Sequence, residues 1–112
     1  MITGTHLMIF SKDAEADRAF LRDMLEIKNI DAGGGWLIFA MPPTEMGVHP
    51  SDKNDVHEIY LMTDDLNAEL AKLGAKGVAY DTPHQESWGM ATSIVLPGGG
   101  KLGLYQPRHA RP

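Results

Sequence analysis

The stretch L-P-G-G-G-K-L-G-L-Y-Q-P, residues 96–107, says more about the fold than any other part of the sequence. Pro97 has no backbone N–H, and the three glycines after it accept positive φ angles, so residues 97–100 are expected to form a turn. The apolar residues on either side, 92–96 and 102–105, are typical of strands. The sequence therefore predicts an antiparallel hairpin that closes the chain.

An earlier segment repeats the plan of this hairpin. Residues 36–41 (W-L-I-F-A-M) are rich in strand formers, Pro42 and Pro43 interrupt them, and residues 45–49 (E-M-G-V-H) follow. Strand, proline turn and short strand thus occur twice in the chain. This repetition predicts that the chain consists of two similar halves.

A strand and a helix precede each hairpin. Residues 5–11 (T-H-L-M-I-F-S) and 57–63 (H-E-I-Y-L-M-T) both predict strands. Asp13 and Asp65 follow these strands at the same interval, and each is a good N-cap for a helix whose apolar residues recur at helical spacing. The first helix is expected to end near residues 25–26.

The remaining segments are predicted with weaker patterns. Residues 27–32 and 78–82 are expected to form short strands, and residues 83–86 a loop. The polar residues 50–55 contain no apolar periodicity and are expected to connect the halves.

Together these elements predict an α+β fold in which two βαβββ modules, residues 1–51 and 52–112, form a curved mixed sheet around a cleft. At 112 residues the chain is large enough for one core and too small for two independent ones. One helix covers one face of each sheet, so the other face must pack against a second module or line a cleft.

Composition excludes several classes of function. No apolar run approaches the roughly 20 residues that span a bilayer, so we expect no membrane insertion. A net charge of −5 with scattered basic residues argues against nucleic-acid binding. The chain has no cysteine, which removes disulfides, thiolate metal sites and a cysteine nucleophile and is consistent with a cytoplasmic location.

Alternation along the predicted strands indicates which side chains face the cleft. If His6 points into it, then Met8 and Phe10 do as well, and the matching positions of the other strands follow by the same count. The residues expected to line the cleft in this way are His6, Met8, Phe10, His49, Glu58, Tyr60, Met62 and Tyr105. A lining of apolar and aromatic side chains with a few polar groups is typical of small-molecule sites. For Tyr105, a hydroxyl in the cleft and a place in the core are both open.

The segments T-H-L-M-I-F-S-K-D, H-E-I-Y-L-M-T-D-D-L and P-G-G-G-K-L-G-L-Y-Q-P, in this order, resemble the vicinal oxygen chelate superfamily over essentially the whole chain. That superfamily contains glyoxalase I, extradiol dioxygenases, and fosfomycin and bleomycin resistance proteins. The resemblance also places Trp88 at the rim of the cleft, where it either stacks on a ligand or plugs the open end of the sheet.

In metal-dependent members, one ligand comes from each of four strands. The resemblance carries these positions onto His6, Gly47, Glu58 and Gly103, and two of the four have no side chain. Two protein ligands make a poor site, because tight sites generally use three or four. We therefore expect no metal cofactor. The alternative is a divalent metal ion held by His6, Glu58 and His49. If the strand that contains His57 slips by one residue, His57 takes the place of His49 as the third ligand.

Three hypotheses about function follow. The first is metal-independent binding of a small organic molecule, partly aromatic or planar, in the manner of the bleomycin resistance proteins. The alternative is a lyase, isomerase or dioxygenase with a reduced metal set, and whether the protein is an enzyme is left open, with no catalytic residue assigned. In the third, packing closes the cleft and the protein acts by associating with another chain. The resemblance also implies a homodimer.

Overall fold

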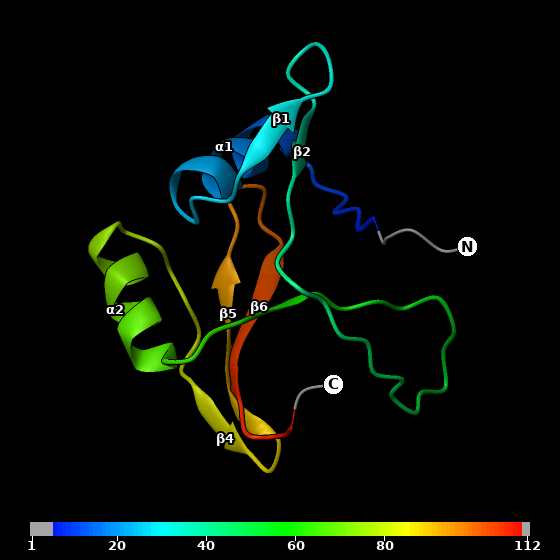
Figure 1. The fold of residues 1–112 in the computed structure, drawn as a ribbon, viewed down its shortest axis with the longest axis vertical. Coiled ribbons are helices and arrows are strands. Elements are labelled where there is room, and N and C mark those ends of the chain that lie inside the picture. Colours follow the sequence, from blue (N-terminus) through cyan, green and yellow to red (C-terminus); the bar gives the residue numbers. More distant parts are fainter. Residues whose placement is uncertain (1–5, 111–112) are drawn as a thin grey trace.

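The computed structural model describes residues 6–110, and this part of the chain forms two helices and six strands. In order these are α1 (Ala14–Asp23), β1 (Asn29–Asp31), β2 (Leu37–Phe39), β3 (Tyr60–Met62), α2 (Leu66–Ala75), β4 (His84–Glu86), β5 (Gly89–Val95) and β6 (Lys101–Pro107). The arrangement confirms the predicted α+β fold (Figure 1). Neither helix in the described residues has the length and apolar character needed to cross a membrane.

The second half of the chain has the predicted order of one strand, one helix and three strands. Its four-stranded sheet has the order β3-β6-β5-β4, with β3 parallel to β6 and the other pairs antiparallel. The predicted closing hairpin is confirmed, since β5 pairs with β6 from Gly89↔Pro107 to Val95↔Lys101. In its turn, Gly99 has a φ of +95°, which explains the glycine at this position.

The core lies between α2 and one face of this sheet. Leu66, Leu70 and Leu73 share one side of α2 and are at most 4% exposed. They pack with apolar side chains of the sheet and of the neighbouring segments: Phe20, Val78, Ile94, Leu96, Leu102 and Leu104. Burial of this apolar surface is the main stabilising contribution, at about 25 cal/mol per Å² removed from water.

Besides the packing of Phe20 in the core, a buried carboxylate connects helix α1 to the second half. Asp13 caps the helix by accepting a hydrogen bond from the Ala16 N–H at 3.1 Å. One turn later Asp17, which is 6% exposed, accepts the Gly98 N–H at 2.7 Å. Figure 1 shows α1 beside the β1–β2 hairpin at one end of the molecule and α2 beside the four-stranded sheet.

The first half differs from the prediction at both of its ends. Residues 6–11 and 45–49 form no strand, and Thr5 lies outside the described residues. Strands require neighbours for their ladder hydrogen bonds, and the segment beginning at Pro42 and Pro43 lacks N–H donors at those positions. Without that closing strand, residues 6–11 have no ladder partner, and among the described residues of this half only β1 and β2 pair.

Two segments of the second half also differ from the prediction. Residues 84–86, expected as loop, form β4 because the tight turn before Gly89 folds them back onto β5. Residues 78–82, expected as a strand, make only an isolated bridge, Tyr80↔Ile94. Both segments thus bond to β5, and only residues 84–86 continue the ladder over three successive pairs.

Candidate functional site

The face of the four-stranded sheet opposite α2, which we call the open face, carries the candidate site. Leu102 and Leu104 of β6 are buried toward α2, so Gly103 and Tyr105 point to the open face by alternation. In the parallel pair, Tyr60 of β3 lies next to Gly103 and Met62 lies next to Tyr105. The residues that the alternation of both strands predicted to share a face therefore do share one.

The ring of Tyr60 occupies the space that a side chain at position 103 would need. A Cβ atom built on Gly103 would lie 2.6 Å from Tyr60 Cε1 and 2.7 Å from Tyr60 Cγ, which real Cβ atoms do not tolerate. A longer side chain at position 103 and the Tyr60 ring thus exclude each other. Glycine here is a packing requirement for the aromatic ring.

Three aromatic rings meet on the open face, and we call Tyr60, Trp88 and Tyr105 the aromatic cluster. The ring centroids of Tyr60 and Tyr105 are 5.6 Å apart at 90°, and those of Trp88 and Tyr105 are 5.5 Å apart at 78°. These are the edge-to-face arrangements that the ring quadrupole favours. Tyr60 and Trp88 remain 42% and 40% exposed, so each leaves ring surface available to a ligand.

Polar groups surround the Tyr105 hydroxyl. Its oxygen lies 3.5 Å from Glu45 Oε1, to which the hydroxyl donates, and 3.2 Å from His109 Nε2. The Glu45 side chain is only 17% exposed, and its Oε1 lies 3.6 Å from His109 Nε2. A carboxylate, a phenol and an imidazole therefore converge beside the aromatic cluster and offer both donors and acceptors.

A hollow of about 370 Å³ adjoins this cluster. Its lining comes from the segment before α1, from β3 and the residues preceding it, and from β5 and β6. The described lining residues are Met8, Ile9, Phe10, His57, Glu58, Ile59, Tyr60, Ser93, Lys101, Leu102 and Gly103. A volume of this size suits a small organic molecule.

The structure brings most of the predicted site residues to this region. Met8, Phe10, Glu58 and Tyr60 line the hollow, while Met62, Trp88 and Tyr105 lie on or beside the same face. His6 and His49 are not among the described lining residues. His49 instead lies in an exposed loop, where its Nδ1 is 2.7 Å from the Pro50 carbonyl oxygen.

Sequence reasoning missed two polar residues of the site, Glu45 and His109. Glu45 was assigned to a strand that does not form, and His109 follows the last strand. Only the contact across 60 residues between Glu45 and Tyr105 reveals the first, and the ring contact of His109 with Tyr105 reveals the second. Neither contact has a local sequence signal.

The surroundings of Tyr60 raise the pKa of its hydroxyl. Partial burial is the larger cause, and the negative charge of Glu58 is the second. The phenol is therefore protonated at neutral pH and available as a hydrogen-bond donor.

The donor set does not fit the metal centre that the superfamily's enzymes use. Gly47 and Gly103 supply no ligand atom, and the space beside Gly103 is filled by the Tyr60 ring. Gly47 lies in a loop, because the predicted strand 45–49 does not form, and a Cβ atom added to it would meet nothing within 4 Å. Among residues 6–110, no three His, Asp or Glu side chains are grouped closely enough to hold an ion.

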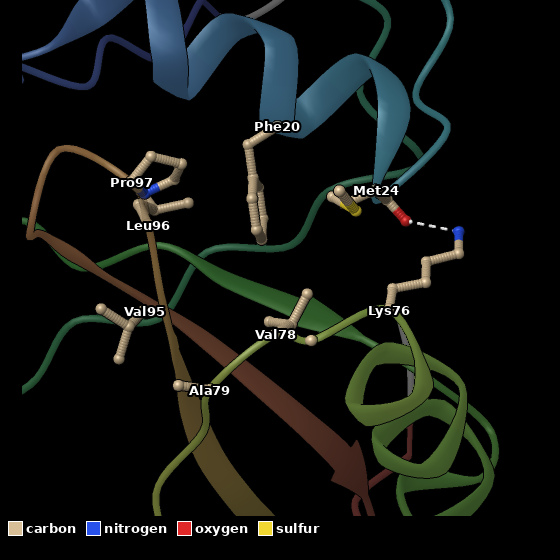
Figure 2. Close-up of a pocket in the computed structure, with 9 residues that line it drawn as sticks. Phe20, Met24, Lys76, Val78, Ala79, Val95, Leu96 and Pro97 are labelled. Atoms are coloured by element: carbon tan, nitrogen blue, oxygen red, sulfur yellow. Dashed lines mark hydrogen bonds between the residues drawn. The ribbon is translucent and has the colours of Figure 1, made fainter.

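A second hollow, of about 350 Å³, lies on the other side of the sheet between α1 and the end of α2 (Figure 2). Phe20 points from α1 toward Val78 and Leu96 in this view. Lys76 is the one charged side chain among its described lining residues, and its Nζ donates to the Met24 carbonyl oxygen at 3.1 Å. Because the Lys76 ammonium group is already hydrogen-bonded, we assign this hollow to the packing interface between the two halves.

Several solved structures resemble this fold. TnmS3, an antibiotic binding protein from Streptomyces sp. CB03234, is 25% identical, with a TM-score of 0.65 over 96% of this chain and 99% of that chain. A glyoxalase/bleomycin resistance protein from the same organism is 25% identical, with a TM-score of 0.60 over 86% of this chain and 93% of that chain. Lactoylglutathione lyase from Agrobacterium tumefaciens, at 15% identity, shares the fold with a TM-score of 0.63 over 92% and 94%.

No protein-family profile and no curated protein matches the sequence. The assignment therefore depends on the order of the elements, the β3-β6-β5-β4 sheet and the agreement with these structures over nearly their whole length. On these grounds the chain has the fold of the vicinal oxygen chelate superfamily, that of the glyoxalases, bleomycin resistance proteins and dioxygenases, and resembles its members.

Proposed function

We propose that this protein binds a small organic molecule with a planar or aromatic part on the open face of its sheet, without a metal ion. The observation that carries the proposal is the aromatic cluster beside the hollow, with the Tyr60 ring held over Gly103. Exposed ring surface beside converging polar groups is the usual composition of such sites. The likeness to TnmS3, described as an antibiotic binding protein, supports the same class of function.

A thermal-shift screen of aromatic compounds is the first test. A ligand that binds only the folded state raises the melting temperature by mass action. Binding is then measured by Trp88 fluorescence in a Trp36→Phe background, because Trp36 and Trp88 are the two tryptophans. Trp36 is the tryptophan to replace, since its ring lies against α1, with its centroid 4.7 Å from the guanidinium carbon of Arg18.

In this background, Tyr105→Leu is expected to weaken binding of the screened compound about tenfold, since the ring contributes both contact area and its edge-to-face partners. Ile38→Ala in β2, an exposed apolar residue away from the open face, is the control and is expected to leave binding unchanged. Equal affinity in both variants would contradict placement of the ligand on the open face.

Metal dependence is tested separately. Elemental analysis of protein purified without a histidine tag is expected to give no stoichiometric divalent metal, and His6→Ala is expected to change nothing. Stoichiometric metal that is lost in His6→Ala would instead support the enzyme hypothesis, a lyase, isomerase or dioxygenase with His6, Glu58 and His49 as ligands.

We also propose that the protein is a homodimer. Phe10, Met46 and Val48 are each more than 90% exposed and come from the two segments of the first half that lack strand partners. Exposed apolar residues that form a contiguous patch mark protein–protein interaction sites. A second copy would supply the missing neighbours.

Light scattering during size-exclusion chromatography is expected to give twice the 12.3 kDa chain mass. Phe10→Glu and Val48→Glu are expected to give monomers with an unchanged circular dichroism spectrum. A monomeric wild-type protein would exclude the dimer, and co-purification of a different chain at stoichiometric amounts would favour association with another protein.

A further inference from the structure

The charged groups around the aromatic cluster are unequally distributed. Glu58 lines the same hollow as Tyr60, and Glu45 Oε1 lies 3.5 Å from the Tyr105 hydroxyl. Each of these two rings thus has a carboxylate close to it, from segments more than ten residues apart. Carboxylates thus approach the two rings from two different segments, and Glu45 Oε1 also lies 3.6 Å from His109 Nε2.

The basic residues near the hollow are already engaged. Lys101 is the one Lys or Arg among the described lining residues, and its Nζ lies 2.9 Å from Asp81 Oδ2. The Arg108 guanidinium lies 2.9 Å from the Gln85 side-chain amide, on β4. Lys101 is thus paired with a carboxylate and Arg108 contacts a neutral amide, whereas Glu58 is exposed toward the hollow.

At position 103 metal-dependent members of the superfamily carry a metal ligand, whereas this chain has glycine with an aromatic ring beside it. This replacement changes the charge of the molecule that the cleft attracts. A bound divalent ion attracts anionic oxygens, whereas the face of an aromatic ring carries the negative end of its quadrupole. The Tyr60 ring fills the space beside Gly103, and the Tyr105 ring stands nearly perpendicular to both the Tyr60 ring and the Trp88 ring. An exposed ring face next to a carboxylate, as at Tyr60 and Glu58, is a favourable setting for a cation.

We infer that the ligand is an organic cation, a planar or aromatic molecule that carries an ammonium or other positively charged nitrogen. The nitrogen is expected to lie between the Tyr60 ring and Glu58, with the aromatic part against Trp88 and Tyr105. This inference rests on the proposed function, because it specifies the charge of the molecule bound at that same site.

Three tricyclic aromatic probes of similar size separate charge from shape. Proflavine is cationic, 9-anthracenemethanol is neutral and 9-anthracenecarboxylate is anionic. Their binding is measured by equilibrium dialysis at pH 8, above the range in which imidazoles ordinarily titrate, so that histidine charge does not contribute. We expect proflavine to bind at least about tenfold more tightly than the neutral probe, and the anionic probe to bind most weakly.

Substitutions test which residues produce the preference for the cationic probe. Glu58→Gln is expected to weaken proflavine binding about fivefold and to leave 9-anthracenemethanol binding unchanged, because it removes charge and keeps shape. Tyr60→Leu is expected to weaken proflavine about fivefold as well. Glu15→Gln, an exposed carboxylate in the first turn of α1, removes the same charge elsewhere and is expected to have no effect.

The results distinguish failure of the cation inference from failure of the proposed small-molecule site. Equal or tighter binding of the neutral or anionic probe at the open face would overturn the cation while leaving a small-molecule site. The inference of a cationic ligand is also contradicted if Glu58→Gln and Glu15→Gln weaken proflavine binding equally. The effect would then come from the net charge of the protein alone. Failure of all three probes to bind would overturn both. Circular dichroism confirms that each variant is folded, and Glu58→Gln, at an exposed position, keeps the test valid if Tyr60→Leu does not fold.

Discussion

The two halves of this chain follow the same sequence plan but fold to different extents. The second half forms a four-stranded sheet covered by α2, with Leu66 and Ile94 completely buried. The first half forms α1 and a hairpin of three-residue strands, and Phe10 is 94% exposed. The comparison teaches that similar local patterns produce a complete module only where every strand finds a neighbour for its backbone hydrogen bonds.

The largest expected difference lies in the cores of the two halves. Ile94→Ala removes a fully buried side chain and is expected to lower the free energy of unfolding by about 2–5 kcal/mol. Ile38→Ala in β2, at a position 37% exposed, is expected to cost less than about 1 kcal/mol. Urea denaturation followed by circular dichroism measures both. Similar losses would mean that the first half is as tightly packed as the second.

The two glycines at matching positions provide a sharper comparison. Gly103→Ala places a Cβ against the Tyr60 ring and is expected to cost about 1–3 kcal/mol. Gly47→Ala has open space around it and is expected to change stability by less than about 0.5 kcal/mol.

The Tyr60→Ala, Gly103→Ala double variant tests the cause of that cost. If the clash with the ring is responsible, the double variant is less destabilised than the sum of the single losses, measured by the same denaturation experiment. Additive losses would contradict the mutual exclusion of the ring and a side chain at position 103.

The attachment between the halves is tested at Asp17. Asp17→Ala leaves the Gly98 N–H without its 2.7 Å acceptor and is expected to cost about 1–2 kcal/mol. Hydrogen exchange is expected to show faster exchange in α1 than in α2, because the carboxylate joins α1 to the closing turn. Glu15→Ala, exposed on the same helix, is the control and should leave both helices protected. Equal loss of protection in α1 and α2 would show that the halves unfold as one unit.

The helix caps are the smallest stability test, since both halves carry the same bond. Asp13 accepts the Ala16 N–H and Asp65 accepts the Ala68 N–H, each at 3.1 Å. Replacing either Asp by Ala is expected to cost about 1 kcal/mol. Differential scanning calorimetry measures the loss, and a cost confined to Asp65→Ala would mean that α1 contributes little to global stability.

Titration of Tyr60 probes the charge of the open face. Burial and Glu58 both raise the pKa of this phenol, so its contribution to stability is present below about pH 10, the ordinary tyrosine pKa, and is lost as pH rises through the folded-state pKa. Absorbance at about 295 nm, with Tyr60→Phe subtracted, follows ionisation of this residue. Glu58→Gln is expected to lower the pKa while burial still holds it above the ordinary value. An unchanged pKa would place Glu58 too far from the ring to set the charge of the site.

Local patterns were sufficient for part of the fold. Asp13 and Asp65 predicted both helix starts, and Pro97 with its three glycines predicted the closing turn, because caps and turns depend on residues that are neighbours in sequence. The alternation of β3 and β6 also predicted that Glu58, Tyr60 and Tyr105 belong to one face. These are properties that a segment retains wherever it is placed.

Other features were decided only by tertiary structure. Residues 6–11 and 45–49 have strand composition and form no strand, while His84–Glu86 has little and forms one. Strand formation depends on an available neighbour, which composition does not encode.

The site shows the same division. The sequence determined which side chains alternate to the open face and that position 103 has none. Only the parallel register of β3 with β6 placed the Tyr60 ring over Gly103, and only the path of the loop brought Glu45 to Tyr105 across 60 residues. Contacts between distant residues depend on register and chain path, which are set by the packing of the whole molecule rather than by local preference.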